Sequence, residues 1–275
     1  MPRIALITGA NQGLGRALVA GLADRMAPDD RILLTGRDPQ RVNAAADALP
    51  ANVEGRVLDV RDGAAIEALA AELGEVDIVF SSATARMTPD VDPADEVDAV
   101  AETNNLAAIR ILRAFGPRVR PGGRLIIVAS ALGTLNRLDE RVADRFERAA
   151  GEDLDAVEAE VAEWRQAVHE RRAEADGYGS WLNIPSKVAQ VAAVRAAARS
   201  SDGRLVMALC PGLVDTDASR PWFADMTEAQ TPAAAAAWPV DLALAERYDP
   251  AFHGELVQFG KVIPWRTGAP VPRLA

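Results

Sequence analysis

A short glycine-rich segment near the start of the chain is the clearest candidate for chemistry. The apolar run 4–7 leads into a loop that carries Gly9, Gly13 and Gly15, and a helix-forming stretch follows. Glycine permits tight turns and a close approach of backbone to ligand, and a helix N-terminus offers free N–H groups and a positive dipole end. The pattern predicts a site for the pyrophosphate of a dinucleotide; taken alone, it also fits an ordinary strand-to-helix turn.

Three polar side chains later in the chain are candidates for the reaction itself. Asn104 lies in a long helix-forming stretch, Ser130 follows the apolar run 126–129, and Lys187 lies near the start of another helix-forming stretch. Hydroxyl and ammonium groups such as those of Ser130 and Lys187 can donate hydrogen bonds to a substrate oxygen that gains negative charge. Taken singly, Asn104 also fits a buried helix amide and Ser130 a strand-end hydroxyl.

These candidates need a framework that positions them. Apolar strand-like runs alternate with helix-forming stretches, which is typical of parallel strands joined by right-handed helical crossovers. We predict one α/β domain over residues 1–275, with a doubly wound, Rossmann-like parallel sheet. After the first strand, we expect strands at 31–34, 53–58, 76–80, 124–129, 204–209 and 255–259, and helices at 13–26, 40–48, 62–73, 94–116 and 185–199.

The composition limits the classes of partner and location. A net charge of -10 and a pI near 4.8 argue against binding to nucleic acid, and no basic run predicts attachment to a membrane surface. The single cysteine, Cys210, excludes an internal disulfide and fits a reducing cytoplasm as a buried apolar side chain. The first strand starts too early for a signal peptide, and no stretch is long enough to span a membrane. We expect a small-molecule substrate and no metal site.

Two stretches interrupt the alternation of strands and helices. Residues 137–176 hold 13 acidic and 7 basic residues among 40. An apolar stripe at helical spacing runs through them: Leu154, Val157, Val161, Trp164 and Val168. The stripe predicts a helical insertion packed on the domain, serving either as a solvated arm or as a lid or partner surface. Residues 219–238 combine prolines with large apolar side chains and predict either a mobile cover over a pocket or ordinary loop packing.

The order of these motifs resembles the short-chain dehydrogenase/reductase family over nearly the whole chain. The family's motifs occur here in their usual order: the glycine loop, Thr103-Asn104, Ser130 with Gly133, Lys187 and the run Pro211-Gly212-Leu213-Val214-Asp215-Thr216. The charged insertion between Ser130 and Lys187 is similar to that of the family's carbonyl-reductase-like branch. In that branch the insertion covers the helix face used for dimers elsewhere, so the resemblance favours a monomer and leaves a dimer possible.

The resemblance also implies roles for individual residues. Ser130 would bind the substrate oxygen, Lys187 would hold the nicotinamide ribose, and Asn104 would support a water that links Lys187 to solvent. Asp59 would contact adenine, and Gly212 with Thr216 would lie beside the nicotinamide. The complete set of expected cofactor-binding residues is Thr8, Gly9, Asn11, Gln12, Gly13, Leu14, Gly15, Arg37, Asp59, Val60, Ser82, Ala83, Lys187, Pro211, Gly212, Val214 and Thr216.

The residue after the second predicted strand favours NADP(H) as the cofactor. Arg37 stands where an acidic residue would otherwise bind an adenosine ribose, and a guanidinium makes paired, charge-assisted bonds to a 2'-phosphate. Arg37 also fits a solvated surface charge. Gln12 occupies a loop position where many NADP-binding relatives carry a second basic residue.

Asn183 is the departure that matters most for the chemistry. The family's proton donor is a tyrosine four residues before the lysine, and here that position is Asn183, which also fits a helix N-cap ahead of Pro185. A carboxamide donates hydrogen bonds but gives up no proton near neutral pH, so loss of the acid would slow carbonyl reduction by about 10²- to 10⁴-fold. Tyr178, between two glycines, could swing into the pocket or serve in packing or at the pocket rim. Thr84 replaces a family glycine beside the cofactor.

Three functions remain open at this point. The first is an NADP(H)-dependent oxidoreductase that reduces a C=O or conjugated C=C bond of a small apolar molecule, with Ser130, Asn183 and Lys187 as hydrogen-bond donors. The second is a redox-silent isomerase, cyclase or dehydratase on the same fold. The third is a non-catalytic dinucleotide-sensing protein whose insertion binds a partner.

Overall fold

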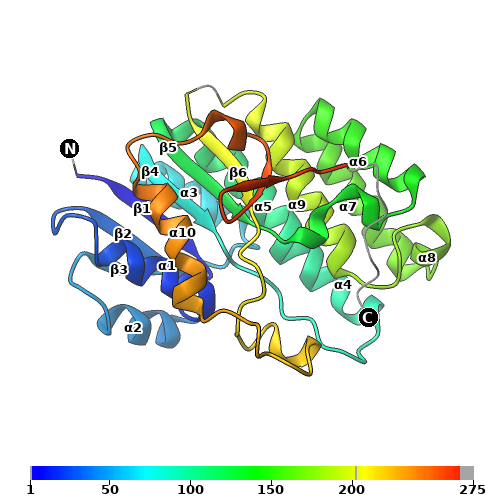
Figure 1. Cartoon of the computed structure of the whole chain (residues 1–275), viewed down its shortest axis with the longest axis horizontal. Helices are drawn as coiled ribbons and strands as arrows, with labels where there is room; N and C mark the ends of the chain where they lie inside the picture. Colours follow the sequence, from blue (N-terminus) through cyan, green and yellow to red (C-terminus); the bar gives the residue numbers. More distant parts are fainter. Residues whose placement is uncertain (1, 202, 267–275) are drawn as a thin grey trace.

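An eight-stranded sheet forms the centre of the protein (Figure 1). This computed structural model describes residues 2–201 and 203–266. The strand order is β3-β2-β1-β4-β5-β6-β7-β8, in which all neighbours are parallel except β8, which runs antiparallel to β7. The strands are β1 (Ile4–Thr8), β2 (Arg31–Gly36), β3 (Val53–Val57), β4 (Val76–Ser81), β5 (Val119–Val128), β6 (Leu205–Leu209), β7 (Leu256–Gln258) and β8 (Lys261–Ile263). The doubly wound, Rossmann-like α/β fold is therefore confirmed, and the sheet carries one antiparallel edge strand, β8, that the sequence did not predict.

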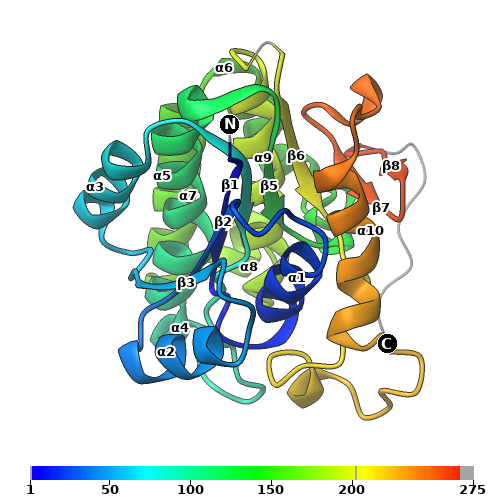
Figure 2. The same cartoon turned by 90° about the vertical axis from the view of Figure 1, so that its left-hand side faces the viewer.

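Helices cover both faces of the sheet, as Figure 2 shows. One face carries α1 (Gly13–Ala23), α2 (Pro39–Asp47) and α10 (Pro232–Leu244), and the other carries α3 (Gly63–Leu73), α4 (Pro93–Val100), α5 (Ala107–Phe115) and α9 (Asn183–Ala198). The central strands β1, β4 and β6 are almost wholly buried, because a parallel sheet has an apolar layer on each side. The helix expected at 94–116 is divided by a π-helical segment, Ala101–Leu106.

The charged insertion forms a helical layer outside α9. It consists of α6 (Glu140–Glu152), α7 (Leu154–His169) and α8 (Ala173–Asp176). Of the expected apolar stripe, Val157, Val161, Trp164 and Val168 are buried, while Leu154 is partly buried against the same core. This stripe packs α7 onto the domain, so its charged side chains are left for solvent and for neighbouring helices.

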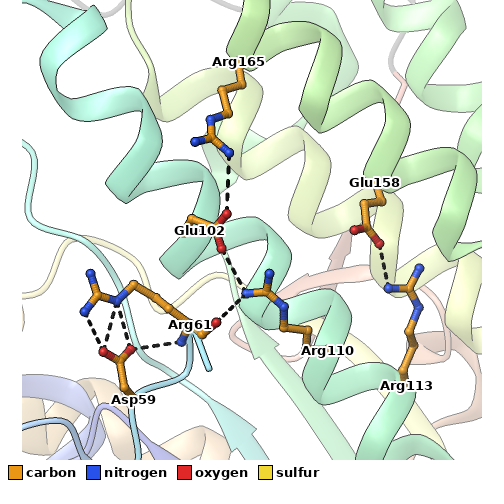
Figure 3. Close-up of polar contacts among 7 residues, drawn as sticks. All are labelled: Asp59, Arg61, Glu102, Arg110, Arg113, Glu158 and Arg165. Atoms are coloured by element: carbon orange, nitrogen blue, oxygen red, sulfur yellow. Dashed lines mark hydrogen bonds and ion pairs between the residues drawn. The ribbon is translucent and has the colours of Figure 1, made fainter. Parts of the chain in front are cut away.

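Ion pairs join α7 to the helices beneath it (Figure 3). Arg113 of α5 pairs with Glu158, and Arg165 lies 3.5 Å from Glu102 in the π-helical segment. Glu102 also accepts from Arg110, whose guanidinium donates at 3.1 Å to the carbonyl oxygen of Arg61 after β3. The insertion thus packs against α9, α4 and the π-helical segment, and ion pairs connect it to α5.

Residues 219–238 do not form one covering segment. Residues 232–238 are the first turns of α10, which packs against α1, so a cover could extend only as far as residue 231. In the remaining part, the Trp222 ring lies 5.5 Å from the Trp181 ring that precedes α9. The role of residues 219–231 as a pocket cover stays a prediction.

The described residues hold neither a membrane-spanning helix nor a metal-binding cluster. None of the described helices is both long and apolar enough to cross a bilayer. No group of three or more histidine, cysteine or carboxylate side chains within residues 2–201 and 203–266 could hold a metal ion.

Candidate functional site

The loops after β1 and β4 pack closely together and form the floor of the candidate nucleotide site. Thr8 accepts hydrogen bonds at its hydroxyl from the N–H groups of Ser82 and Ala83, at 3.1 and 3.3 Å. Gly9 has a φ of 63°, and a Cβ there would lie 2.5 Å from the Cα of Ala83. Only glycine fits both this conformation and this contact. The glycine thus lets the two loops meet.

The N-terminus of α1 is open toward the same place. Gln12 occupies the N-cap position and makes no side-chain capping bond, so it leaves N–H groups of the first helical turn available to a ligand. Gly15 permits the tight turn, because a Cβ there would lie 2.5 Å from the carbonyl oxygen of Gly9. Thr216, from the segment after β6, lies against Gly13 across this opening. These residues form a cradle in which glycine backbone and the free N–H groups of α1 meet, an arrangement suited to a phosphate.

Other predicted cofactor residues surround the cradle. Asn11, in the loop after β1, packs its side chain against the end of β2: the carboxamide oxygen lies 3.1 Å from the position that a Cβ on Gly36 would take. Leu14 packs beneath the loop with the core shared by α1, α2 and α10. After β6, Gly212 adopts a φ of 78°, and the carbonyl oxygen of Pro211 accepts from Gln230. The backbone of Val214 pairs with that of Gln230, which holds the segment near Thr216.

Two arginines lie at the far end of the cradle, and sequence reasoning identified only one of them. Arg37 is exposed immediately after β2, and Asp38 caps α2 by accepting from the N–H groups of Gln40 and Arg41. The Arg41 guanidinium reaches back to donate to the Gln12 side chain. It therefore supplies a basic group at the loop position where Gln12 itself is neutral. The sequence signal that could have identified Arg41 is its position in the first turn of the helix after β2.

The predicted adenine contact, Asp59, is held by a neighbouring arginine. Its carboxylate accepts hydrogen bonds from the Arg61 guanidinium, with one N–O distance of 2.6 Å (Figure 3). These hydrogen bonds lower the pKa of the Asp59 carboxyl below its ordinary value. Val60, the next residue, is buried beneath it. The pair therefore presents a fixed acceptor at the end of β3.

The end of β5 and the start of α9 bring Ser130 and Lys187 into one region. Ser130 follows β5 and caps a short 3-10 turn, with its hydroxyl accepting from the N–H of Leu132 at 3.2 Å. Within that turn, a Cβ on Gly133 would lie 2.7 Å from the carbonyl oxygen of Lys187. Glycine at this position therefore lets α9 approach the serine turn directly. The Cys210 thiol, at the end of β6, accepts from the N–H of Ala131.

Lys187 is a buried amine without a carboxylate partner among the described residues. Its Nζ donates to Oε1 of Gln190 at 2.8 Å. Burial lowers the pKa of the Lys187 ammonium to about 8, and the nearby Cys210 thiol opposes this shift. An amine with this pKa exchanges its charge within the neutral to mildly alkaline range, where catalytic acids and bases work.

Asn104 makes contacts that differ from the expected water-supporting role. Its side-chain oxygen accepts from the N–H of Ala85 at 2.8 Å and from the Thr84 hydroxyl at 3.1 Å. Its main-chain oxygen accepts from Nε2 of Gln190 at 3.0 Å. Thr84, which replaces a family glycine, is therefore tied to Asn104. The Gln190 side chain, which sequence reasoning did not identify, bridges the Asn104 carbonyl oxygen and the Lys187 amine, and the expected water link from Asn104 to Lys187 stays a prediction.

Asn183 is the first residue of α9, one turn before Lys187. The N-cap is Leu182 and makes no side-chain capping bond, so the expectation that Asn183 caps this helix is wrong. The Asn183 side-chain oxygen is buried and has no hydrogen-bond partner within the described part of the chain. Residues four apart share one helix face, so Asn183 and Lys187 lie on the same side of α9. A buried amide oxygen without a partner is costly, and a hydrogen-bond donor of a ligand could satisfy it.

Neither tyrosine of the chain takes the place of the missing phenol. The sequence has two, Tyr178 and Tyr248. Tyr178 is fully buried under the insertion, with the Arg145 guanidinium 5.9 Å from its ring, and burial raises its pKa to about 12. Tyr248 packs against Arg124, six residues before Ser130 along β5 and so roughly 20 Å away. Tyr178 thus has a packing role, and its proposed swing into the pocket is not supported.

Comparisons with known proteins agree with this geometry. Residues 3–142 match the family model described as short chain dehydrogenase. The chain is 31% identical to carbonyl reductase [NADPH] 3 of Rattus norvegicus, over 96% of this chain and 98% of the relative. It is 30% identical to carbonyl reductase [NADPH] 1 of Sus scrofa, over 96% and 94%. Salutaridine reductase from Papaver somniferum shares the fold, with a TM-score of 0.79, 20% identity, and coverage of 92% of this chain and 99% of that one. The NADPH-bound carbonyl reductase from chicken fatty liver shares it with a TM-score of 0.70, 20% identity, and coverage of 96% and 99%.

Proposed function

Because the chain belongs to the short-chain dehydrogenase family, we propose that it binds NADP(H) and reduces a carbonyl or a conjugated C=C bond of a small apolar molecule. The relatives that it matches over nearly their whole length are named as NADPH carbonyl reductases. The geometry of the described residues also fits this cofactor, independently of the relatives. Gly9 and Gly15 leave space that a Cβ would fill, and the open N-terminus of α1 offers donors for a pyrophosphate.

The two arginines beyond the cradle support a preference for the phosphorylated nucleotide. Arg37 has no ion-pair partner among the described residues, and Arg41 donates to the neutral side chain of Gln12. Both guanidinium groups remain able to form paired bonds with a 2'-phosphate. When bound, NADPH supplies a hydride ion to an electron-poor carbon.

The observation that carries the proposed chemistry is the carboxamide of Asn183 beside Lys187, with both tyrosines elsewhere. Hydride addition to a ketone carbon leaves an alkoxide that must be protonated, and no phenol is present to do this. Hydride addition to the distant carbon of an enone moves an electron pair to the carbonyl oxygen and forms an enolate. Ser130, Asn183 and Lys187 can stabilise this enolate by hydrogen bonds, and a solvent proton then completes reduction at the α carbon. The site therefore favours conjugated substrates over simple ketones.

Replacement of Asn183 by tyrosine tests this preference. We expect Asn183→Tyr to leave NADPH binding unchanged, since the residue lies at the substrate end of the site. Turnover of NADPH would be measured with a panel of simple ketones and matched enones. We expect the wild type to prefer enones and the variant to shift toward ketones by about 10-fold or more, because a phenol beside Lys187 restores an acid. Asn183→Gln, which keeps the carboxamide, is the control and should retain the enone preference.

Two outcomes would contradict the proposal. If the wild type consumes no NADPH with any substrate of the panel but binds the nucleotide tightly, a sensing role takes its place. If products form at the same rate without nucleotide, the protein is an isomerase, cyclase or dehydratase on the same fold.

We further propose that the protein is a monomer in the cytoplasm. Insertion helix α7 packs against α4 and α9 and is held there by ion pairs such as Arg165–Asp98, which leaves this face unavailable to a second copy. Cys210 is buried, as expected for a protein in a reducing compartment. Sedimentation equilibrium of the purified protein at micromolar concentrations should give the mass of one chain, and a mass of two chains would contradict the monomer.

A further inference from the structure

The side chain of Gln190 connects two groups of the candidate active site. Gln190 lies on α9, three residues after Lys187, and only 3% of its surface is exposed. Its Oε1 accepts from Nζ of Lys187 at 2.8 Å, and its Nε2 donates to the main-chain oxygen of Asn104 at 3.0 Å. Both ends of the carboxamide are therefore used, which fixes its orientation.

The two partners of Gln190 belong to different elements: Lys187 lies on α9, and Asn104 lies in the π-helical segment. Asn104 lies in the π-helical segment Ala101–Leu106, where the regular hydrogen-bond ladder changes register and carbonyl oxygens can accept from side chains. Asn105 Nδ2 donates to the main-chain oxygen of Ser186 at 2.7 Å, which ties the same segment to α9 beside Lys187. The amide of Gln190 thus lies in a closely packed, polar contact between two helices.

We propose that Gln190 is the positioning residue of Lys187, and that its carboxamide closes the inner route by which water would carry protons to the amine. The proposal rests on the proposed function only for its catalytic consequence. A water molecule between Lys187 and the Asn104 carbonyl could pass a proton, whereas a carboxamide in that place donates and accepts without exchanging one near neutral pH. With Asn183 in place of a phenol and Gln190 in place of water, the site holds a proton-relay chain broken on both sides of Lys187.

The electrostatic surroundings make Gln190 important to the charge state of the amine. Among the described residues, the titratable group that acts on Lys187 is Cys210, at the end of β6. None of the described carboxylates forms an ion pair with the Lys187 amine. The Gln190 oxygen is therefore the acceptor that stabilises the ammonium form in a buried place.

A titration of Lys187 by NMR tests the positioning role without any substrate. The sequence has only two lysines, Lys187 and the exposed Lys261, so side-chain lysine signals give one reporter and one internal control. In Gln190→Met, which keeps the length but removes both amide groups, we expect the Lys187 midpoint to fall by about one pH unit while Lys261 stays unchanged. In Gln190→Glu, the added carboxylate should raise the Lys187 midpoint above that of the wild type.

Val194→Ala is the matched packing control. Val194 is buried on α9 one turn after Gln190 and does not contact Lys187 through a hydrogen bond, so its truncation should leave the Lys187 midpoint unchanged. Midpoints that are equal in folded wild type, Gln190→Met and Gln190→Glu would overturn the positioning role. If Gln190→Met does not fold, the direction of the shift in Gln190→Glu still decides.

A double variant tests the closed proton route. Asn183→Tyr should gain ketone reduction only in part, because Gln190 still blocks water. Adding Gln190→Ala, which opens space for water beside Asn104, should raise the ketone rate by about a further 10-fold, and Gln190→Ala alone should not. If Asn183→Tyr alone gives the full gain, the closed route is wrong. Absence of turnover in every variant would count against the proposed function, and the NMR titrations would still decide the positioning role.

Discussion

The two ends of the site differ in how they follow the family pattern. At the phosphate end, Gly9, Gly13 and Gly15 occupy positions where a larger side chain would disturb the loop or fill the space for a ligand. At the reaction end, Asn183 and Thr84 replace the expected tyrosine and glycine, and Gln190 bridges Lys187 and the Asn104 carbonyl.

The difference teaches that the departures at the reaction end are organised rather than random. Thr84 donates to Asn104, the Asn104 carbonyl accepts from Gln190, and Gln190 accepts from Lys187. The buried residues Asn104 and Gln190 are paired in this series of hydrogen bonds, whereas the buried side-chain oxygen of Asn183 has no partner within the described residues. We therefore propose that the nucleotide-binding end keeps the family geometry, while the supply of protons at the reaction end differs from it.

The largest expected effect comes from breaking the phosphate end. Gly9→Ala forces a side chain into a left-handed backbone conformation and against the backbone of Ala83, so we expect NADPH affinity to fall by at least about 100-fold. Isothermal titration calorimetry would measure the affinity. Gly151→Ala is the control, because Gly151 lies in α6 with open space around it, and it should keep full affinity and gain up to about 1 kcal/mol of stability. Equal affinities for the two variants would show that the cradle does not hold the nucleotide.

A smaller effect concerns the pH dependence of the reaction end. With a pKa of about 8, Lys187 is an ammonium below pH 8 and loses its charge above it. Turnover that depends on this ammonium should decline above about pH 8, and Lys187→Met should remove most activity together with this pH dependence.

The same amine affects stability with a definite sign. The unfolded chain keeps Lys187 charged up to a pKa near 10.5, so between about pH 8 and 10.5 the unfolded state binds more protons than the folded one. The free energy of unfolding of the nucleotide-free wild type should therefore rise across this range relative to Lys187→Met. Urea denaturation at several pH values would measure it, and a parallel pH dependence of the two proteins would contradict the buried amine.

The smallest of these effects concerns the choice between nucleotides. Arg41→Ala should weaken NADPH binding by about 10-fold and leave NADH binding nearly unchanged, because we expect the 2'-phosphate to be the one part of the nucleotide within reach of the guanidinium. Arg25→Ala serves as the control, since Arg25 pairs with Asp241 on the exposed surface between α1 and α10. A uniform loss for both nucleotides would place Arg41 in loop packing through Gln12 and not in phosphate binding.

The sequence predicted most of the strands and helices, because their apolar periodicity and glycine turns are local signals. It did not predict β8, whose three residues Lys261–Ile263 are mostly polar or exposed and form a strand only because β7 offers an edge. It also predicted an unbroken helix over 94–116, since the π-helical segment has no local mark and is accompanied by contacts of Asn104 and Asn105 with α9.

The sequence alone determined which residues are available for chemistry: a glycine loop suited to phosphate, Ser130 and Lys187, and Asn183 where a tyrosine was expected. Residue types and their spacing carry this information because turns, strands and helix starts are set by residues that are close along the chain. Only the tertiary structure decided that Arg41 reaches Gln12, that Tyr178 is buried away from the site, and that Gln190 links Lys187 to Asn104. These contacts join residues up to 86 positions apart, and packing of helices on the sheet, rather than any local pattern, sets which of them meet.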